Sequence, residues 1–362
     1  MNVKQLFERV PSDREAEERA WMVVRAAYAE RERVRVPVAR RRRLLLAGAG
    51  VALAAAVAAA SFSSPGRAVV NAVRRTIGIS NAAPALFKLP APGRLLVSGS
   101  GGTWVVAPDG SKRRLGDYTQ AAWSPHGLYV IGATTDGLAA VEPSHGTVHW
   151  SLARPDVLDP RWGGSRTDTH VAYLSKGRLR IVAGDGTGDA GISARSRVAP
   201  AWRPGNVRQL AFVGGDGRVR LLGAWRSAHR YADPRLLVWS RDGSQLLLVT
   251  ARELVLFSAR SGHAQTLHLR GVSAAAFSAQ GQLAVVQRHA ILVLNGEQTR
   301  PVFTTRVALR GLVWSPNGRW LLTSLPAADQ WVFVGRRSVL AVSHIARQFG
   351  GAVSLDGWVP GA

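Results

Sequence analysis

The sequence contains no cysteine in its 362 residues. Disulfide bonds and metal sites built from thiolates are therefore excluded. The nine histidines are scattered and form no HExxH pair, so we expect neither a metal ion nor another cofactor. The sequence also lacks a GxSxG elbow, a P-loop, a GxGxxG turn after a strand and a paired-carboxylate signature. These absences predict that the protein is not an enzyme.

Lysine is scarce, with four residues, yet the net charge is +24. Arginine therefore carries almost all of the positive charge. One interpretation is a dispersed arginine-rich surface that follows from the base composition of the gene. The other is attraction to polyanions such as nucleic acid, anionic lipid or cell-wall phosphate. Apolar residues make up 46% of the chain, which is enough to form a sizeable core.

Charge is absent from residues 44–62, LLLAGAGVALAAAVAAASF. As a helix these 19 residues would be roughly 28 Å long, which is close to the hydrocarbon thickness of a bilayer. The segment is immediately preceded by a basic block of Arg40, Arg41, Arg42 and Arg43. The positive-inside rule then places residues 1–43 in the cytoplasm, makes residues 44–62 a transmembrane helix and puts the remainder outside.

An exported protein with a cleaved signal is the alternative. The stretch RRRRLLLAG resembles a twin-arginine leader, and alanine-rich sites near the end of the apolar segment could be cleaved. An n-region of 43 residues is long for a signal peptide, which favours a retained anchor.

The cytoplasmic segment contains one expected amphipathic helix, at about residues 12–34. Ser12 and Glu15 have the spacing of a capping box, and apolar residues recur after them at helical spacing. The helix is too short to bury its apolar stripe alone. Residues 1–40 are therefore expected to contact the membrane, a second copy or a cytoplasmic protein, unless the helix only positions the anchor.

An aromatic residue followed by a polar turn recurs along the rest of the chain. The clearest examples are WSPHG, WSRDG and WSPNG, and WRPGN, FSAQG and RWGGS are degenerate versions. The separations are 39, 40, 37, 38 and 37 residues, and a constant period near 40 is typical of a repeat protein. The repeated aromatic positions are Trp123, Trp162, Trp202, Trp239, Phe277 and Trp314.

Each period contains four strand-like segments separated by turn residues. Four short antiparallel strands make one blade of a β-propeller. A single blade cannot bury both of its faces, whereas a closed ring covers each blade with its neighbours. The sequence therefore predicts an all-β propeller over residues 85–362, in which the repeated aromatic residues pack between blades rather than bind a ligand.

The WSPHG, WSRDG and WSPNG turns resemble the W/F-S-P-D-G turn of TolB-like and WD-repeat-like β-propellers. The resemblance spans residues 85–360 and implies the propeller fold. In these families propellers serve as protein-binding platforms, sensor domains or appendages to peptidases. As a whole, the chain resembles the single-span, propeller-bearing membrane proteins of GC-rich Gram-positive bacteria.

Seven blades are favoured, and six or eight remain open. The segment before the first repeated tryptophan supplies about three strands, so one blade needs a fourth. That strand is either ALFKL at residues 85–89 or the tail AVSLDGW at residues 352–358, in which Val353 follows Trp314 by 39 residues. The second option joins the first and last strands in one blade and closes the ring.

These features predict a membrane-anchored, extracytoplasmic propeller that acts as a noncatalytic module for a protein or cell-envelope ligand, joined to its anchor by a linker at residues 63–84. The alternative is a transmembrane regulator, like an anti-sigma factor, that couples ligand binding to a cytoplasmic transcription factor. The zinc-binding residues of many anti-sigma factors are missing. A hydrolase-like site in the central funnel is the remaining alternative. Nucleic acid is not expected, because most of the positive charge lies on the exported side.

Overall fold

The computed structural model describes residues 88–165, 167–296 and 298–361. The expected amphipathic helix, the basic block, the apolar segment 44–62 and the linker 63–84 lie outside these residues. Within the described ranges, no helix is long and apolar enough to cross a membrane.

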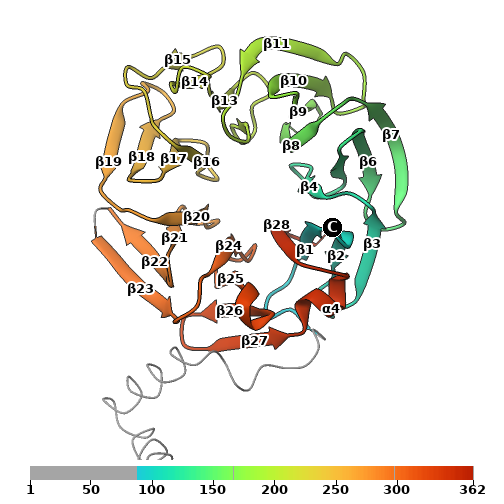
Figure 1. Cartoon of the computed structure of the whole chain (residues 1–362), viewed down its shortest axis with the longest axis vertical. Helices are drawn as coiled ribbons and strands as arrows, with labels where there is room; N and C mark the ends of the chain where they lie inside the picture. Colours follow the sequence, from blue (N-terminus) through green and yellow to red (C-terminus); the bar gives the residue numbers. More distant parts are fainter. Residues whose placement is uncertain (1–87, 166, 297, 362) are drawn as a thin grey trace, which may run out of the picture. The chain divides into compact units, whose positions relative to one another are not determined.

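The described residues form a ring of seven four-stranded antiparallel sheets (Figure 1). In six sheets the four strands follow one another in the chain, and the innermost strand is the first of the four. The seventh sheet combines the two ends of the described chain. The all-β propeller is confirmed, and the number of blades is seven.

The strands of the first four blades have the following bounds. The first blade contains β28 (Val353–Val359), β1 (Arg94–Gly99), β2 (Gly102–Val106) and β3 (Lys112–Gly116). The second contains β4 (Gln120–Trp123), β5 (Val130–Thr134), β6 (Gly137–Glu142) and β7 (Thr147–Ala153). The third contains β8 (Val157–Gly164), β9 (Thr169–Ser175), β10 (Arg178–Ala183) and β11 (Ala190–Arg195). The fourth contains β12 (Ala201–Trp202), β13 (Leu210–Val213), β14 (Val219–Leu221) and β15 (Trp225–Arg226).

The remaining three blades are continuous in the chain. The fifth contains β16 (Pro234–Trp239), β17 (Gln245–Thr250), β18 (Leu254–Ser258) and β19 (Ala264–Leu267). The sixth contains β20 (Val272–Phe277), β21 (Leu283–Gln287), β22 (Ala290–Asn295) and β23 (Gln298–Thr304). The seventh contains β24 (Arg310–Trp314), β25 (Trp320–Leu325), β26 (Gln330–Gly335) and β27 (Val339–Ser343), with a short 3-10 helix, η2 (Pro326–Ala328), before β26.

The ring closes through the C-terminal strand. β28 pairs with β1 over six residue pairs, from Arg94 opposite Val359 to Gly99 opposite Val353. A short helix, α4 (Ile345–Phe349), leads from β27 into β28. Of the two closures that the sequence left open, the structure has the C-terminal one. Leu89, in the other candidate segment, lies in a loop and is buried against the core.

The polar residues after each innermost strand build a compact turn. After Trp239, the Ser240 hydroxyl accepts a hydrogen bond from the Gln245 backbone (2.9 Å), and an Asp242 carboxylate oxygen accepts one from the Ser244 backbone (3.0 Å). Gly243 has a φ of 66°, a left-handed conformation that glycine adopts without strain. The WSRDG sequence thus specifies the reversal between β16 and β17.

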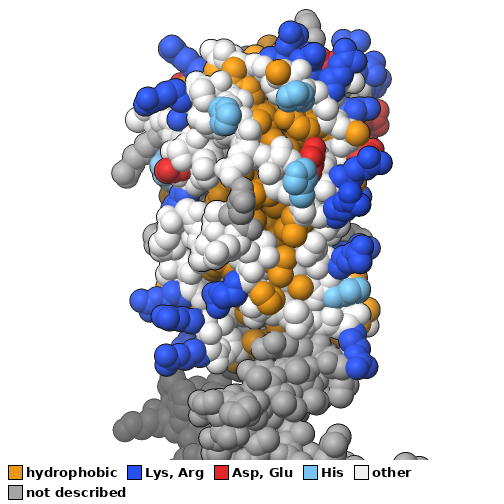
Figure 2. All heavy atoms as spheres, turned by 90° about the vertical axis from the view of Figure 1, so that its left-hand side faces the viewer, with side chains coloured by type: hydrophobic (Ala, Val, Ile, Leu, Met, Phe, Trp, Pro, Cys, Tyr) orange, Lys and Arg blue, Asp and Glu red, His pale blue; other side chains and the backbone are white. Residues whose placement is uncertain are grey.

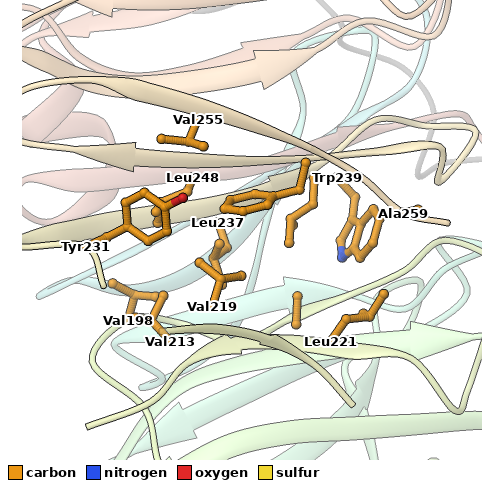
Figure 3. Close-up of a cluster of buried hydrophobic side chains, with 13 residues drawn as sticks. Val198, Val213, Val219, Leu221, Tyr231, Leu237, Trp239, Leu248, Val255 and Ala259 are labelled. Atoms are coloured by element: carbon orange, nitrogen blue, oxygen red, sulfur yellow. The ribbon is translucent and has the colours of Figure 1, made fainter. Parts of the chain in front are cut away.

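Hydrophobic packing divides into seven buried clusters among the described residues, one for each pair of neighbouring blades. Consecutive residues of a second strand face opposite neighbours. In β17, Leu247 packs toward the sixth blade, whereas Leu248 packs toward the fourth, in a buried cluster that also contains Val213 and Leu221 (Figure 3). Both faces of each blade are therefore covered, which explains why these strands read as continuous apolar runs.

Candidate ligand-binding grooves between blades

Five of the six repeated aromatic residues end an innermost strand, and Trp162 lies inside β8. Four indoles donate a hydrogen bond from Nε1 to a backbone carbonyl in the innermost strand of the preceding blade. The pairs are Trp123 to Gly357 (3.3 Å), Trp202 to Arg161 (3.1 Å), Trp239 to Ala201 (3.0 Å) and Trp314 to Ala276 (3.1 Å). The acceptor is always the residue before the aromatic position of its own blade, so these bonds link equivalent points around the ring.

The same rule identifies Trp358 as the seventh aromatic position, because its predecessor Gly357 accepts the bond from Trp123. The tail match that placed Val353 at this position is therefore wrong by five residues. The reason is α4, which lengthens the segment before β28, so that Trp358 follows Trp314 by 44 residues. Three indole nitrogens, those of Trp162, Trp331 and Trp358, are buried without a hydrogen-bond partner among the described residues.

A groove opens between the sixth and seventh blades, on the face of the ring that carries the turns after the innermost strands. We call it the basic groove. Its volume is about 930 Å³, and its walls come from β22, β23, β24, β25, β26, the turn after β26 and the turn before β21. Its charged lining residues are Arg300, Arg319, Arg336 and Arg337.

The four arginines of the basic groove are exposed, and none forms an ion pair with a carboxylate of the described residues. Residues 298–361 contain seven arginines and two aspartates. One of these aspartates, Asp329, accepts a hydrogen bond from the Ala346 backbone at α4 (2.7 Å) and so contributes to the packing of the seventh blade. Among the described residues, no carboxylate therefore neutralises the positive charge of the groove.

Two tryptophans provide apolar surface beside these arginines. Trp314 and Trp320 both line the groove and are partly exposed. A Cβ atom at Gly335 would lie 3.0 Å from the Trp320 ring, so the glycine allows this ring to lie against the third strand. The groove thus combines guanidinium groups with indole faces.

A second groove lies between the second and third blades. We call it the aromatic pocket. Its volume is about 520 Å³. Four rings line it, those of Tyr129, His149, Trp150 and Trp162, together with the carboxylates of Asp168 and Asp185.

The two grooves occupy equivalent places in the repeat. In the seventh blade, the strand pairing aligns Trp314 with Val334 of the third strand, β26. Arg337 follows Val334 by three residues. In the third blade, the pairing aligns Trp162 with Val182 of the third strand, β10. Asp185 follows Val182 by three residues. The same position of the repeat therefore carries a cation, Arg337, in the seventh blade and an anion, Asp185, in the third.

A buried ion cluster holds the second and third blades together. The Asp189 side chain is 6% exposed. Its carboxylate pairs with Arg154 (2.6 Å) and Arg180 (2.7 Å) and accepts a hydrogen bond from the Tyr173 hydroxyl (2.6 Å). Burial would raise the pKa of Asp189, but the bonds from Arg180, Tyr173 and Arg154 outweigh it and lower that pKa. Burial and the Asp189 bond raise the pKa of Tyr173 to about 12.

The stretch GDGTGD, which ends in Asp189, forms the hairpin between β10 and β11. Asp185 accepts hydrogen bonds from the backbone and hydroxyl of Thr187 (3.0 and 2.7 Å). Nowhere in the described part of the chain do three histidine or acidic side chains gather in a way that could hold a metal ion.

A carboxyl group also lies at the ring closure. Asp356 occupies the register shift between β28 and β1, and its Oδ2 is buried without a partner among the described residues. Burial raises the pKa of Asp356 to about 7, although a hydrogen bond from Ser98 and the charge of Arg161 act in the opposite direction. Nothing in the sequence distinguishes this aspartate from an exposed one.

Side-chain charge elsewhere on the ring is spread widely. On the side that carries β19 and β23, Figure 2 shows lysine and arginine side chains along both edges and hydrophobic side chains between them. This distribution agrees with the dispersed arginine-rich surface. The basic groove is a place where arginines also line a concave surface.

No protein-family model and no curated protein matches this chain. Solved structures with a similar fold include the C-terminal WD40 domain of Sif2, with a TM-score of 0.53 and 9% identity over 77% of this chain and 90% of that one. They also include the β-propeller domain of Cps50 (Swd1) from Myceliophteria thermophila, with a TM-score of 0.50 and 12% identity over 63% and 86%. The chain is thus a seven-bladed β-propeller of the WD40-like fold.

The expectation that the protein is not an enzyme needs correction. A "putative 6-phosphogluconolactonase" from Bacteroides uniformis has a TM-score of 0.52 and 16% identity with this chain, covering 70% of it and 97% of the other. The propeller fold is therefore shared with a protein described as an enzyme. The absence of familiar motifs does not exclude catalysis on this fold, since function depends on the site rather than on the architecture.

Proposed function

We propose that this chain is a membrane-anchored, extracytoplasmic propeller that binds a phosphate-bearing polymer of the cell envelope in the basic groove. The observation that carries the proposal is the set of four groove arginines without a carboxylate partner among the described residues. The sequence left protein and envelope ligands open. The local excess of arginine favours an anionic envelope ligand.

Guanidinium groups are suited to phosphate because their planar donors bind two oxygens at once. Arg319 follows the turn after β24, and Arg336 and Arg337 lie in the turn after β26, so the seventh blade presents three cations along one wall. Arg300, on β23, adds a fourth from the sixth blade. A chain of phosphates lying along the groove would meet cations on both sides.

Binding of sodium polyphosphate by the full chain tests this function. The variant R319Q/R336Q/R337Q removes three charges from exposed side chains, so the fold should be retained. We expect polyphosphate affinity to fall about tenfold or more at low salt, which corresponds to roughly 1.4 kcal/mol. Isothermal titration calorimetry measures the change.

The matched control is R208Q/R241Q/R260Q. These three arginines are also exposed, and Arg208 and Arg241 lie in turns on the same face of the ring. The control variant has the same net charge as the groove variant and should bind polyphosphate within about twofold of the unmodified chain. Equal losses in both variants would mean that only net charge matters, and the groove would lose its assigned role.

The uncharged segment 44–62 and the arginines that precede it support the proposal that the chain is anchored in a membrane. We expect the full chain to stay in the membrane fraction at alkaline pH and the propeller to be digested by protease added to intact cells. Release at alkaline pH would instead favour the cleaved, exported form. Protection from protease until the cells are opened would contradict the extracytoplasmic location.

A transmembrane regulator is the second candidate, because residues 12–34 have the pattern of an amphipathic helix that needs a partner. Capture of a sigma factor by immobilised residues 1–40, lost when Val24 and Tyr28 are replaced by serine, would support it. Failure to capture a sigma factor would contradict the regulator role.

A further inference from the structure

The aromatic pocket takes no part in the proposed function, and its chemistry differs from that of the basic groove. The Tyr129 and Trp162 rings are nearly parallel, with centroids 6.1 Å apart and planes at 20°. The His149 ring meets Tyr129 edge-on, at 5.0 Å and 80°. Three rings from two blades therefore form a continuous aromatic wall.

The walls of the pocket are held in place before any ligand arrives. The Trp150 indole donates a hydrogen bond to the Gly184 carbonyl (2.8 Å), which joins the second blade to the β10–β11 hairpin. Gly186 has a φ of 88°, and a Cβ atom there would lie 2.8 Å from the Trp150 ring. The glycine thus allows hairpin and ring to pack together, and the Asp189 cluster fixes the end of the same hairpin.

The charges that line the pocket among the described residues are negative. Both hydrogen bonds from Thr187 to Asp185 orient its carboxylate, and they lower its pKa, so the group is ionised at neutral pH. Asp168 supplies the second carboxylate, with the His170 ring 3.4 Å away. The faces of aromatic rings carry negative electrostatic potential as well.

We propose that the aromatic pocket binds an organic cation, that is, an ammonium or guanidinium group carried on an apolar body. Aromatic faces attract such groups by cation–π interaction, and the attraction increases when the cation is partly desolvated. The two carboxylates add a charge-assisted contribution. A volume of about 520 Å³ is large enough for a small alkylammonium ion or for a basic side chain of a protein.

The probes are choline, Nα-acetyl-arginine amide and 3,3-dimethylbutan-1-ol, each titrated into the full chain. The alcohol has nearly the shape of choline but no charge. We expect at least one of the two cations to bind about tenfold or more tightly than the alcohol, because the pocket favours positive charge. Preference for choline would point to a small alkylammonium ligand, and preference for the arginine derivative would point to a basic protein side chain.

Two variants locate the binding. D168N/D185N keeps the side-chain shapes and removes both charges, and Tyr129→Leu removes one ring. Each should weaken the preferred cation about tenfold, whereas Arg337→Gln, at the position equivalent to Asp185 in the basic groove, should leave it unchanged. Thermal melting checks that each variant is folded. Equal binding of charged and neutral probes, no cation binding at millimolar concentration, or full binding by folded D168N/D185N would each overturn the proposal.

Discussion

The Trp123 indole donates a hydrogen bond to the Gly357 carbonyl, although the two residues are 234 positions apart in the chain. The bond joins the second blade to the C-terminal strand that completes the first. Three further indoles make the same bond between other pairs of blades. Repetition in the sequence is thus converted into repeated contacts around the ring, and ring closure depends on the same contact as the other interfaces.

The indole bonds should contribute measurably to stability. Trp202 makes this bond at 3.1 Å, whereas the Trp162 nitrogen is buried without a partner among the described residues. Both Trp202→Phe and Trp162→Phe remove the same ring atoms, and Phe277 shows that a phenyl ring fits an equivalent position. We expect Trp202→Phe to lower the free energy of unfolding by about 1–2 kcal/mol more than Trp162→Phe. Equal losses in urea denaturation would show that the hydrogen bond adds nothing to packing.

The Asp189 cluster should be costly to disrupt. Asp189→Ala leaves the partly exposed Arg154 and Arg180 without their shared, buried carboxylate, so we expect a loss of about 1.5–3 kcal/mol. Asp216→Ala is the control, because its pair with Arg220 is more exposed and such pairs contribute little. Chemical denaturation of both variants measures the difference. A loss no larger than that of the control would mean that the cluster does not hold the blades together.

Asp356 should make stability depend on pH. Its pKa is about 7 in the folded chain, against an ordinary value of 3.8. Between these values the folded protein holds a proton that the unfolded chain has released, so this group's contribution falls as pH rises from about 4 to about 7. At pH 8, Asp356→Asn should be more stable than the unmodified chain by about 2–4 kcal/mol, and at pH 4 the two should be similar. A constant difference between pH 4 and pH 8 would contradict the assignment.

The closing strand should be indispensable. Truncation after Gly351 removes β28 and exposes the edge of β1 together with the apolar face that Trp358 covers. An open edge and an uncovered face favour association and unfolding. We expect loss of the cooperative thermal transition or aggregation in size-exclusion chromatography. Truncation after Pro360, which keeps β28, is the control, and an unchanged transition in the shorter chain would show that the ring does not need its last strand.

The fold could be predicted because propeller repeats leave a regular signal. WSRDG and WSPNG specify the turn, and runs such as LLLVT specify a strand buried on both faces. The position of Trp358 could not be predicted by spacing, since α4 interrupts the period. What identifies Trp358 is a hydrogen bond to its neighbour Gly357, which only the assembled ring displays.

The grooves were much less predictable. Of their lining residues, the sequence singled out Trp162 and Trp314, and it assigned both to blade packing. Arg319 and Arg337 look like any other turn arginines, because a groove forms only when two blades lie side by side. The contrast between Arg337 and Asp185 becomes visible only once the strand registers show that they are equivalent.

Salt dependence of polyphosphate binding tests most directly whether the basic groove contacts phosphate through its arginines. Each direct contact releases counterions, so the logarithm of the affinity falls with the logarithm of the salt concentration by roughly 0.7 per phosphate neutralised on a flexible strand. The unmodified chain should show a slope steeper by about two than that of R319Q/R336Q/R337Q, with R208Q/R241Q/R260Q close to the unmodified chain. Equal slopes for the unmodified chain and the groove variant would contradict the account.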